Sequence, residues 1–581
     1  MKSNARLFFG VFVCLSLAVG AVLGAKAMMD SLYAYRSPLH ANPPAPAEPL
    51  SRAEGWLPSP ARRVVFVLVD ALREDTSLRS EVMPFLNELR QKGAWATMHS
   101  RPTSLSQPGY TTLFTGAWPD LSDGPVLNLD YAQIPAWTQD NLFSAARRAG
   151  LQTAVSGFNW FERLIPGDLL SERYFTAEED KFADHAVVDA ALPWLDDAHF
   201  AFVSIHLDQV DFAGHHEGGP RDPRWNAAAR RCDDLLQEIV AALDLKQDTL
   251  LVTSDHGQIE RGGHGGTEAV VLTEPFVLVG AGVRPGHYPD VQMVDVAPTL
   301  SALLGLSLPA SAQGRVLTEM LTLTPRQMQV VEEAEAAQQS RLAESYLTAI
   351  GVQDVSFGER GVGQGSKGAI DAIRLWRLPR EQLPRTILAL IIGLFPLLFV
   401  IRRVMFAAPH ARKRSNAEGV PVPGWALLDF KRFVVGALFY LFLFNLRYAG
   451  LERRTYSLSS LRSAEDLLSF LGVTVLIALL PGWLLSSNGL KAWRLGARQA
   501  AEASWTFILT TLYFLLLPAL WSYSLNGAVA SWTLPHFPSM FLAFFSLLQI
   551  TFVVGWGLIL TAVCSVIISR RGIGREKVAR L

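Results

Sequence analysis

Apolar residues form two kinds of pattern along the chain. Residues 7–24 make one continuous apolar run that follows Lys2 and Arg6. Such a run is typical of a helix that crosses a bilayer. Further long apolar runs come at 386–401, 433–451, 466–485, 504–524 and 540–568. The pattern therefore predicts a first membrane-spanning helix, a long region outside the membrane, and then a five-span α-helical transmembrane bundle.

The region between the first and second long runs has a different pattern. Its apolar runs are short, as in VVFVLVD at 64–70, and they alternate with amphipathic segments. Continuous β-branched runs suit parallel strands that are buried on both faces. The predicted strands are 64–70, 94–100, 152–158, 199–208, 248–255 and 274–282, and the predicted helices are 83–93, 141–150, 185–195 and 224–243. This alternation predicts an α/β sandwich around a mainly parallel central sheet.

These patterns predict an order of domains. The expected parts are 1–24, an N-terminal transmembrane anchor or signal; 25–61, a Pro-rich linker; 62–316, the α/β domain; 317–384, a helical and Gly-rich connector; and 385–581, the five-span transmembrane domain. Ala25-Lys26-Ala27 resembles a signal-peptidase site, so cleavage of the first run is an alternative to an anchor.

Basic residues are concentrated in alternate loops of the predicted bundle. Lys and Arg are frequent within 402–432, within 491–498 and after residue 569, whereas 525–538 has neither. The 447–465 loop, which has four Arg, fits this alternation less well. The positive-inside rule then predicts that both termini are cytoplasmic and that residues 25–385 are exported. We expect an integral protein of a bacterial inner membrane with an extracytoplasmic α/β domain. The net charge of −1 argues against a nucleic acid polymer as partner.

Acidic residues follow three of the predicted strands. Asp70 ends the first of them, Asp255 ends another, and either Asp208 or Asp211 follows the strand at 199–208. Ligands of open α/β sheets bind at the carboxyl ends of the strands. We therefore expect these acids to face one site.

Histidines accompany two of these acids. His215 follows Asp211 by four positions, and His256 and His264 lie in the glycine-rich stretch LVTSDHGQIERGGHGGTE. Mixed carboxylate and imidazole ligands favour zinc, with manganese or iron as alternatives, and disfavour calcium. We expect the other histidines, His206 among them, to be structural or surface residues.

A nucleophile is expected within RPTSLSQPGYTTLFTG, residues 101–116. Pro108 suits the first turn of a helix, which predicts that Ser106 is its N-cap, with its hydroxyl near backbone N–H groups that can receive an anion. Thr111 and Thr112 fall inside that helix, where packing or bonding to the helix backbone is expected. We expect Tyr110 to be packed or to line the site.

Together these motifs resemble the alkaline phosphatase superfamily, especially its type I phosphodiesterase/nucleotide pyrophosphatase branch, and they are similar to the GPI ethanolamine phosphate transferases. The resemblance covers residues 62–315 and implies an alkaline-phosphatase-like fold for the domain. It implies two divalent metal ions, with zinc favoured. One would be held by Asp70, Ser106, Asp255 and His256, and the other by Asp211, His215 and His264.

The resemblance also implies a mechanism. Ser106 would attack phosphorus and form a phospho-seryl intermediate, and Asn128 would donate to a phosphoryl oxygen; its match requires a one-residue insertion near Leu121. Ser106 stands where nucleotide pyrophosphatases commonly have threonine, whereas some ethanolamine phosphate transferases have serine. Sulfatases of the same fold have arginine at the position of Tyr110, which disfavours a sulfate ester as substrate.

Three functions are consistent with the sequence. The leading one is a membrane-anchored phosphodiesterase or phosphotransferase, including phosphoethanolamine transfer to a lipid or lipid-linked glycan, because a soluble substrate does not need five further spans. The alternatives are hydrolysis of a soluble phosphodiester or nucleotide, and a catalytically inactive membrane scaffold.

Overall fold

A computed structural model of the protein describes residues 2–352, 369–418, 425–461, 464–486 and 497–578. The contacts among these residues group into two compact units. One unit contains Leu32–Arg377 and Ser531–Leu534. The other contains Met1–Ser31, Leu378–Ala530 and Pro535–Leu581, of which the described residues are mainly helical.

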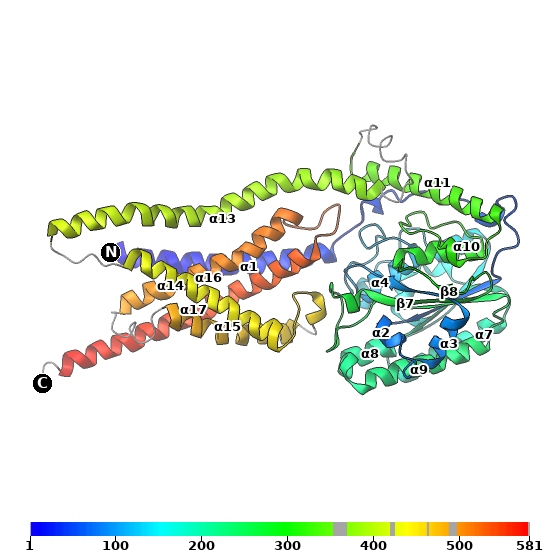
Figure 1. The fold of residues 1–581 in the computed structure, drawn as a ribbon, viewed down its shortest axis with the longest axis horizontal. Coiled ribbons are helices and arrows are strands. Elements are labelled where there is room, and N and C mark those ends of the chain that lie inside the picture. The colour runs from blue at the N-terminus through cyan, green and yellow to red at the C-terminus, as the bar shows by residue number, and fades with distance from the viewer. Residues whose placement is uncertain (1, 353–368, 419–424, 462–463, 487–496, 579–581) are drawn as a thin grey trace. The chain divides into compact units, whose positions relative to one another are not determined.

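The first unit is built around one sheet, which contains nine strands in the described part of the chain (Figure 1). The strands are β1 (Arg63–Val69), β2 (Ala94–His99), β3 (Gln152–Phe158), β4 (Glu172–Thr176), β5 (Phe200–Leu207), β6 (Asp248–Thr253), β7 (Thr273–Gly280), β8 (Gly286–His287) and β9 (Val291–Gln292). Their order is β4-β3-β5-β1-β6-β7-β2-β8, with β9 beside β2. Strands β4, β3, β5, β1 and β6 are parallel, and β7 is antiparallel to β6 and β2. The predicted α/β fold with a mainly parallel sheet is confirmed.

Helices cover both faces of this sheet (Figure 1). They include α3 (Pro84–Lys92), α7 (Lys181–Asp196), α8 (Gln209–His216) and α9 (Pro223–Ala241) on one side and α4 (Ser106–Thr115), α5 (Leu142–Arg148) and α10 (Val296–Leu304) on the other. Shorter helices are α2 (Glu74–Ser77) and α6 (Trp160–Leu164).

Strand β1 joins the two halves of the core. Its alternate residues Val64, Phe66 and Leu68 are buried with residues of α4, α5 and α10, whereas Val65, Val67 and Val69 are buried with residues of α3, α7 and α9. Burying one such side chain contributes roughly 1.5–3 kcal/mol. The sequence is apolar at every position of the strand because both faces are covered.

The helix expected in the connector, α11 (Pro325–Ala349), packs onto the α/β unit. It buries Val330 and Val331 in the same core cluster as β1 and α10. Further along the helix, Tyr346 is buried in a smaller cluster with Leu39 and Ile373. Ile373 belongs to α13 (Ala369–Glu418). This helix continues through residues 384 and 385, where the boundary between the connector and the transmembrane domain was expected.

The second unit contains the long apolar helices. Among the described residues, six helical segments are long and apolar enough to cross a membrane: Gly10–His40, Ile370–Leu398, Lys431–Leu451, Glu465–Ser486, Ala503–Asn526 and Phe537–Val563. They coincide wholly or for the most part with α1 (Lys2–Tyr33), α13, α14 (Trp425–Asn445), α15 (Ala464–Ser486), α16 (Ala497–Asn526) and α17 (Phe537–Val578). Hydrogen bonds join some of them; Tyr440 donates to Gln549 Oε1 over 3.1 Å, and Trp483 Nε1 donates to Ser504 Oγ over 2.8 Å. The predicted transmembrane bundle is confirmed, and the chain is an integral membrane protein.

Candidate functional site

The candidate site is built at the carboxyl ends of three adjacent strands. Strand β1 lies between β5 and β6, with Val69 paired to Leu207 and Leu68 paired to Thr253. Because the three strands are parallel and in this register, the residues that follow them meet at one edge of the sheet. These residues are Asp70, Asp208 and Asp255.

Helix α4 brings Ser106 to this edge. The helix begins at Ser106, and Leu105 is its N-cap residue with an extended backbone. The prediction that Ser106 is the N-cap is therefore wrong by one position. Instead of capping the helix, the Ser106 Oγ lies 3.2 Å from His256 Nε2. A Cβ on Gly109 would lie 2.8 Å from the Asp255 Cβ, so glycine is required for the helix to approach the strand end this closely.

One group of possible metal ligands contains Asp70, Asp255 and His256, all buried. The His256 Nε2 lies 3.6 Å from Asp70 Oδ1 and 3.3 Å from Asp255 Oδ2. These two carboxylate oxygens are buried and have no hydrogen-bond partner among the described residues. Because unpaired buried carboxylate oxygens are costly, this arrangement favours a cation.

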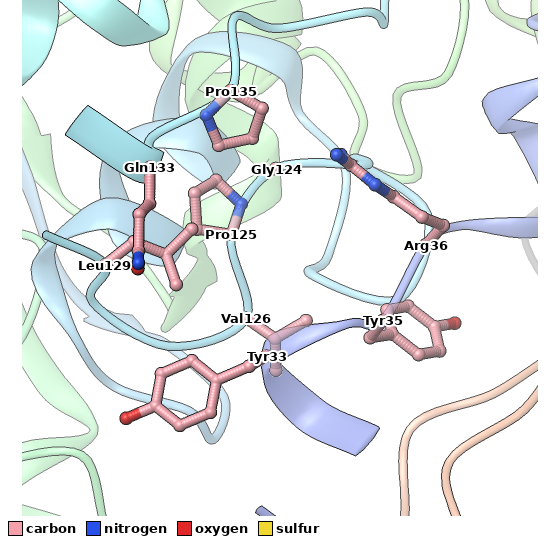
Figure 2. A pocket seen from close by; sticks show the side chains of 9 residues that line it. All are labelled: Tyr33, Tyr35, Arg36, Gly124, Pro125, Val126, Leu129, Gln133 and Pro135. Carbon is pink, nitrogen blue, oxygen red and sulfur yellow. The ribbon is translucent and has the colours of Figure 1, made fainter. Parts of the chain in front are cut away.

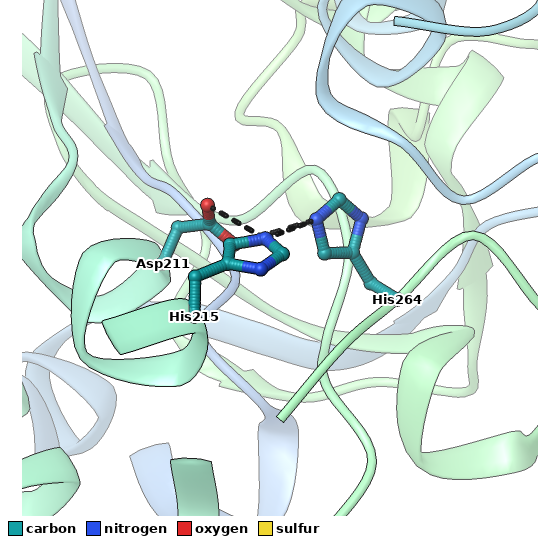
Figure 3. Close-up of side chains that lie close together, drawn as sticks. All are labelled: Asp211, His215 and His264. Atoms are coloured by element: carbon teal, nitrogen blue, oxygen red, sulfur yellow. Dashed lines mark hydrogen bonds and ion pairs between the residues drawn. The ribbon is translucent and has the colours of Figure 1, made fainter. Parts of the chain in front are cut away.

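A second group contains Asp211, His215 and His264 (Figure 3). The His215 and His264 Nε2 atoms are 2.9 Å apart. Asp211 Oδ2 lies 3.4 Å from His215 Nε2, and Asp211 Oδ1 lies 3.6 Å from His264 Nε2. Asp211 and His215 are one turn apart on α8, which places them on one face of that helix. The rings of His264 and His256 stack with centroids 3.9 Å apart, so the two groups adjoin each other.

Hydrogen bonds fix which histidine nitrogen points into each group. The His256 Nδ1 lies 3.2 Å from the Gly257 carbonyl, and the His264 Nδ1 lies 3.1 Å from the Ser104 carbonyl. A carbonyl can only accept, so each Nδ1 carries the proton and each Nε2 keeps its lone pair for a cation. The donor atoms present therefore fit divalent metal ions.

Burial shifts the pKa values of several side chains in the two ligand groups. Burial, together with neighbouring Asp70, raises the pKa of Asp255 well above its usual value, and burial raises the pKa of Asp211. Burial lowers the pKa of His256 and holds that of His264 well below its usual value. The imidazoles are therefore neutral near pH 7, which is the form that binds metals.

Sequence reasoning missed His206. It lies in β5, is buried, and places its Nε2 3.0 Å from Asp70 Oδ2. Tyr110, whose ring stacks on Phe161, donates its hydroxyl hydrogen to the same Asp70 oxygen and lies 2.9 Å from His206. The position of His206 two residues before Asp208 was the signal in the sequence. Alternate residues of a strand point to the same face, so this spacing places His206 and Asp208 on one side of the sheet.

His206 and Asp70 also form a third group of possible ligands with Asp208. In that group the distance from His206 Nε2 to Asp208 Oδ1 is 3.8 Å. The sequence left Asp208 and Asp211 as alternatives, and the structure places both near this edge of the sheet.

Asn128 lies beside the start of α4. Its Oδ1 accepts the Gln107 backbone N–H over 3.0 Å, and Gln107 also bonds to both backbone groups of Leu129. This bond leaves the Asn128 Nδ2 hydrogens available to a ligand near Ser106. Thr111 and Thr112, as predicted, bond back to helix carbonyls, those of Gln107 and Pro108, over 2.8 Å each.

Residues 64–264 match the family model for type I phosphodiesterase / nucleotide pyrophosphatase. The match begins in β1 and ends at His264, so it spans every residue of the two ligand groups. The resemblance expected from the sequence is confirmed.

Curated relatives extend the similarity beyond this domain. The chain is 26% identical over 483 residues to the human "GPI ethanolamine phosphate transferase 2, catalytic subunit", covering 73% of this chain and 48% of that protein. It is 28% identical over 296 residues to the mouse "GPI ethanolamine phosphate transferase 3, catalytic subunit", covering 46% of this chain and 26% of that protein. The chain thus spans about half or less of the length of these relatives.

Among solved structures, human ectonucleotide pyrophosphatase / phosphodiesterase 5 is similar over 42% of this chain and 95% of its own, with 14% identity and a TM-score of 0.37.

Proposed function

We propose that this protein is a membrane-anchored, metal-dependent enzyme that transfers a phosphoryl-linked group, phosphoethanolamine, from a phosphodiester to a lipid or lipid-linked glycan. The observation that carries the proposal is the meeting of Ser106 with two adjoining groups of carboxyl and imidazole side chains at one sheet edge. The family model that matches this part of the chain describes enzymes of phosphodiesters.

Two divalent cations are proposed, one held by Asp70, Ser106, Asp255 and His256 and the other by Asp211, His215 and His264. Zinc is the favoured metal, because zinc sites commonly combine imidazole with carboxylate ligands. Such a pair, when bound, lowers the pKa of a serine hydroxyl and neutralises charge on phosphoryl oxygens.

The side chains of this protein would perform the remaining steps. Ser106 attacks phosphorus in line, which gives a phospho-seryl intermediate and releases the first alcohol. Asn128 would donate from Nδ2 to a phosphoryl oxygen; the proposal is supported by the bond that its Oδ1 accepts from the Gln107 N–H. A hydroxyl of the acceptor, or water, then attacks the same phosphorus and restores Ser106.

The membrane helices and the relatives support a lipid-borne substrate. One helix would suffice to anchor an enzyme of soluble substrates, whereas this chain has six candidate spans in its described part. The two curated relatives are named as GPI ethanolamine phosphate transferases, and the longer of the two matches covers residues well beyond the phosphodiesterase domain. We propose that the α/β domain is extracytoplasmic in a bacterial inner membrane, with both termini cytoplasmic.

The test uses the full chain in lipid nanodiscs. The expected results are about two zinc ions per chain, cleavage of bis-p-nitrophenyl phosphate, and loss of that cleavage with a chelator. Mass spectrometry of lipids from a deletion strain should show a lipid or glycan that lacks phosphoethanolamine. Hydrolysis without any altered lipid would favour the soluble-substrate hydrolase, and no metal with no turnover would favour the scaffold.

A further inference from the structure

A pocket of about 220 Å³ lies in the α/β unit, lined by the end of α1 with the chain that follows it and by the loop that follows α4 (Figure 2). The first segment contributes Tyr33, Tyr35 and Arg36. The second contributes Gly124, Pro125, Val126, Leu129, Gln133 and Pro135. None of these residues is one of the proposed metal ligands.

The pocket combines apolar walls with three polar groups that can bind a ligand. Prolines, Val126 and Leu129 supply the walls. The side chains of Tyr33, Arg36 and Gln133 have no hydrogen bond to any other residue that the structure describes. Arg36 points toward the chain at Gly124, whereas the Tyr33 hydroxyl and the Gln133 amide lie on the other side of the pocket (Figure 2). The Arg36 guanidinium can recognise an anionic, oxygen-rich group such as a phosphate ester.

The wall of the pocket is bonded to the residues around Ser106. Thr103 donates to the Val126 carbonyl, and Gln107 exchanges hydrogen bonds of 2.9 and 3.0 Å with Leu129. Val126 and Leu129 line the pocket, while Thr103 and Gln107 lie on either side of Ser106 in the chain. The pocket and the nucleophile are thus supported by the same loop, which also carries Asn128.

The other wall directly follows a candidate membrane span. Tyr33 is the last residue of α1, and Arg36 comes three residues later, within the apolar segment Gly10–His40. Tyrosine and arginine at the end of a span commonly lie at the level of lipid headgroups. The pocket is therefore lined by the end of a candidate membrane span and by the loop that carries Asn128.

We propose that this pocket binds the phosphate-bearing headgroup of a membrane lipid, with Arg36 as its charge partner. The inference deepens the proposed function, on which it rests, because it assigns the lipid part of the substrate to specific residues. Arg36 is a positioning residue here; it contacts the headgroup and leaves the chemistry to Ser106.

Binding is measured on the full chain with Ser106→Ala, in nanodiscs, with dihexanoyl phosphatidylglycerol as probe. Removing one charge-assisted hydrogen bond should weaken the affinity about tenfold in Arg36→Ala, and Arg36→Lys should recover part of it. The matched control is Arg52→Ala, because Arg52 is an exposed arginine of the same segment that pairs with Glu48. This control should bind the probe like its parent. Equal affinity for Arg36→Ala and Arg52→Ala would overturn the proposal.

Two further measurements separate this inference from the proposed function. The affinity for inorganic phosphate should be the same with and without Arg36→Ala. If Arg36→Ala weakens phosphate binding by the same tenfold, the pocket binds free phosphate, and the proposal of a lipid headgroup is overturned. Turnover of bis-p-nitrophenyl phosphate by the unmodified chain tests the proposed function alone. Absence of turnover together with Arg36-dependent probe binding would refute the proposed enzyme function and support the lipid pocket. Turnover together with Arg36-independent probe binding would support the enzyme function and refute the lipid pocket.

Discussion

At the scale of single residues, Asp70 is the most constrained group of the site. Burial acts to raise its pKa, but the His206 hydrogen bond and the nearby His256 ring outweigh burial and hold the pKa below its usual value. Oδ2 is occupied by Tyr110 and His206, whereas Oδ1 has no partner among the described residues and faces His256. The carboxylate therefore presents one oxygen to a cation and is oriented through the other.

The first prediction distinguishes Ser106 from its neighbour Thr111. Ser106→Ala should reduce turnover of bis-p-nitrophenyl phosphate at least about 1,000-fold, because Ser106 supplies the hydroxyl at His256 Nε2 and no other hydroxyl bonds to that ring among the described residues. Thr111→Ala should keep turnover within a few-fold and lower stability by about 1–3 kcal/mol, since the Trp137 Nε1 loses its acceptor. Steady-state kinetics and thermal unfolding measure the two effects. Near wild-type rates for Ser106→Ala would refute the assignment.

The second prediction concerns the support of Asp70. His206→Ala should lower the affinity for Zn²⁺ roughly 10–100-fold, since residues that orient a ligand have effects of this size. Tyr110→Phe keeps the ring stacked on Phe161 and removes only the hydroxyl, so it should give a smaller loss. Competition with a chromogenic chelator measures the affinity directly. Unchanged affinity in both variants would show that Asp70 needs neither partner.

Most residues of the candidate site could be read from the sequence. Asp70, Asp255 and His256 directly follow apolar runs, and Asp211 with His215 has helical spacing. His206 could not be assigned in this way, because its role depends on which strand lies beside β5. That neighbour is β1, which is far away in the sequence and is identified only by the order of the sheet.

At the scale of elements, all six predicted strands agree with the structure. Strands β1, β2, β3, β5, β6 and β7 lie within about two residues of the predicted ranges. Strand β4 was missed because ERYFT is partly exposed and polar, and β8 and β9 were missed because each has two residues. Short edge strands depend on pairing with a neighbour, which a local pattern does not encode.

One buried acid of β7 gives a third prediction. Burial raises the pKa of Glu274 well above its usual value; Ser100 donates to Oε1 over 2.6 Å, and Oε2 has no partner among the described residues. Ionisation is therefore favoured in the unfolded chain, so this residue lowers stability as pH rises above its unfolded pKa of about 4.3. Glu274→Gln should raise the melting temperature by roughly 2–4 °C at pH 8.

The pH dependence provides the control for Glu274. The gain in melting temperature should shrink as pH falls toward 5, because ionisation of the carboxyl favours the unfolded chain less as pH approaches the unfolded pKa. Exposed Glu88, which pairs with Lys92 on α3, offers a matched substitution to Gln with little effect at either pH. A gain for Glu274→Gln that is the same at pH 5 and pH 8 would contradict the assignment to ionisation.

At the scale of the whole molecule, the count of apolar helices was predicted from the sequence, but their limits were not. The run expected at 386–401 is part of α13, which begins at Ala369, because polar residues before the run continue the same helix. Polar and apolar turns are joined by the same backbone hydrogen bonds, so composition alone does not mark where such a helix starts.

The fourth prediction is the topology. Basic residues in alternate loops favour cytoplasmic termini and an exported segment at 40–380. Alkaline phosphatase fusions after residue 300 should be active, and fusions after residue 412 or 498 should be inactive, with green fluorescent protein fusions giving the opposite pattern. An active fluorescent fusion at residue 300 would place the α/β domain in the cytoplasm and remove the support for an exterior lipid substrate.

The position of β1 between β5 and β6 has a consequence for how the protein matures. Asp70 and His206 are 136 residues apart in the chain, and Ser106 and His256 are 150 apart. A chain that has not yet folded therefore holds the proposed metal ligands on separate, unpaired segments. The proposed zinc ions could be captured only when the middle of the sheet has closed, and a captured ion would then stabilise the closed sheet by mass action. In the proposed topology, the zinc supply outside the cytoplasm would thus set how much of the chain reaches its folded form.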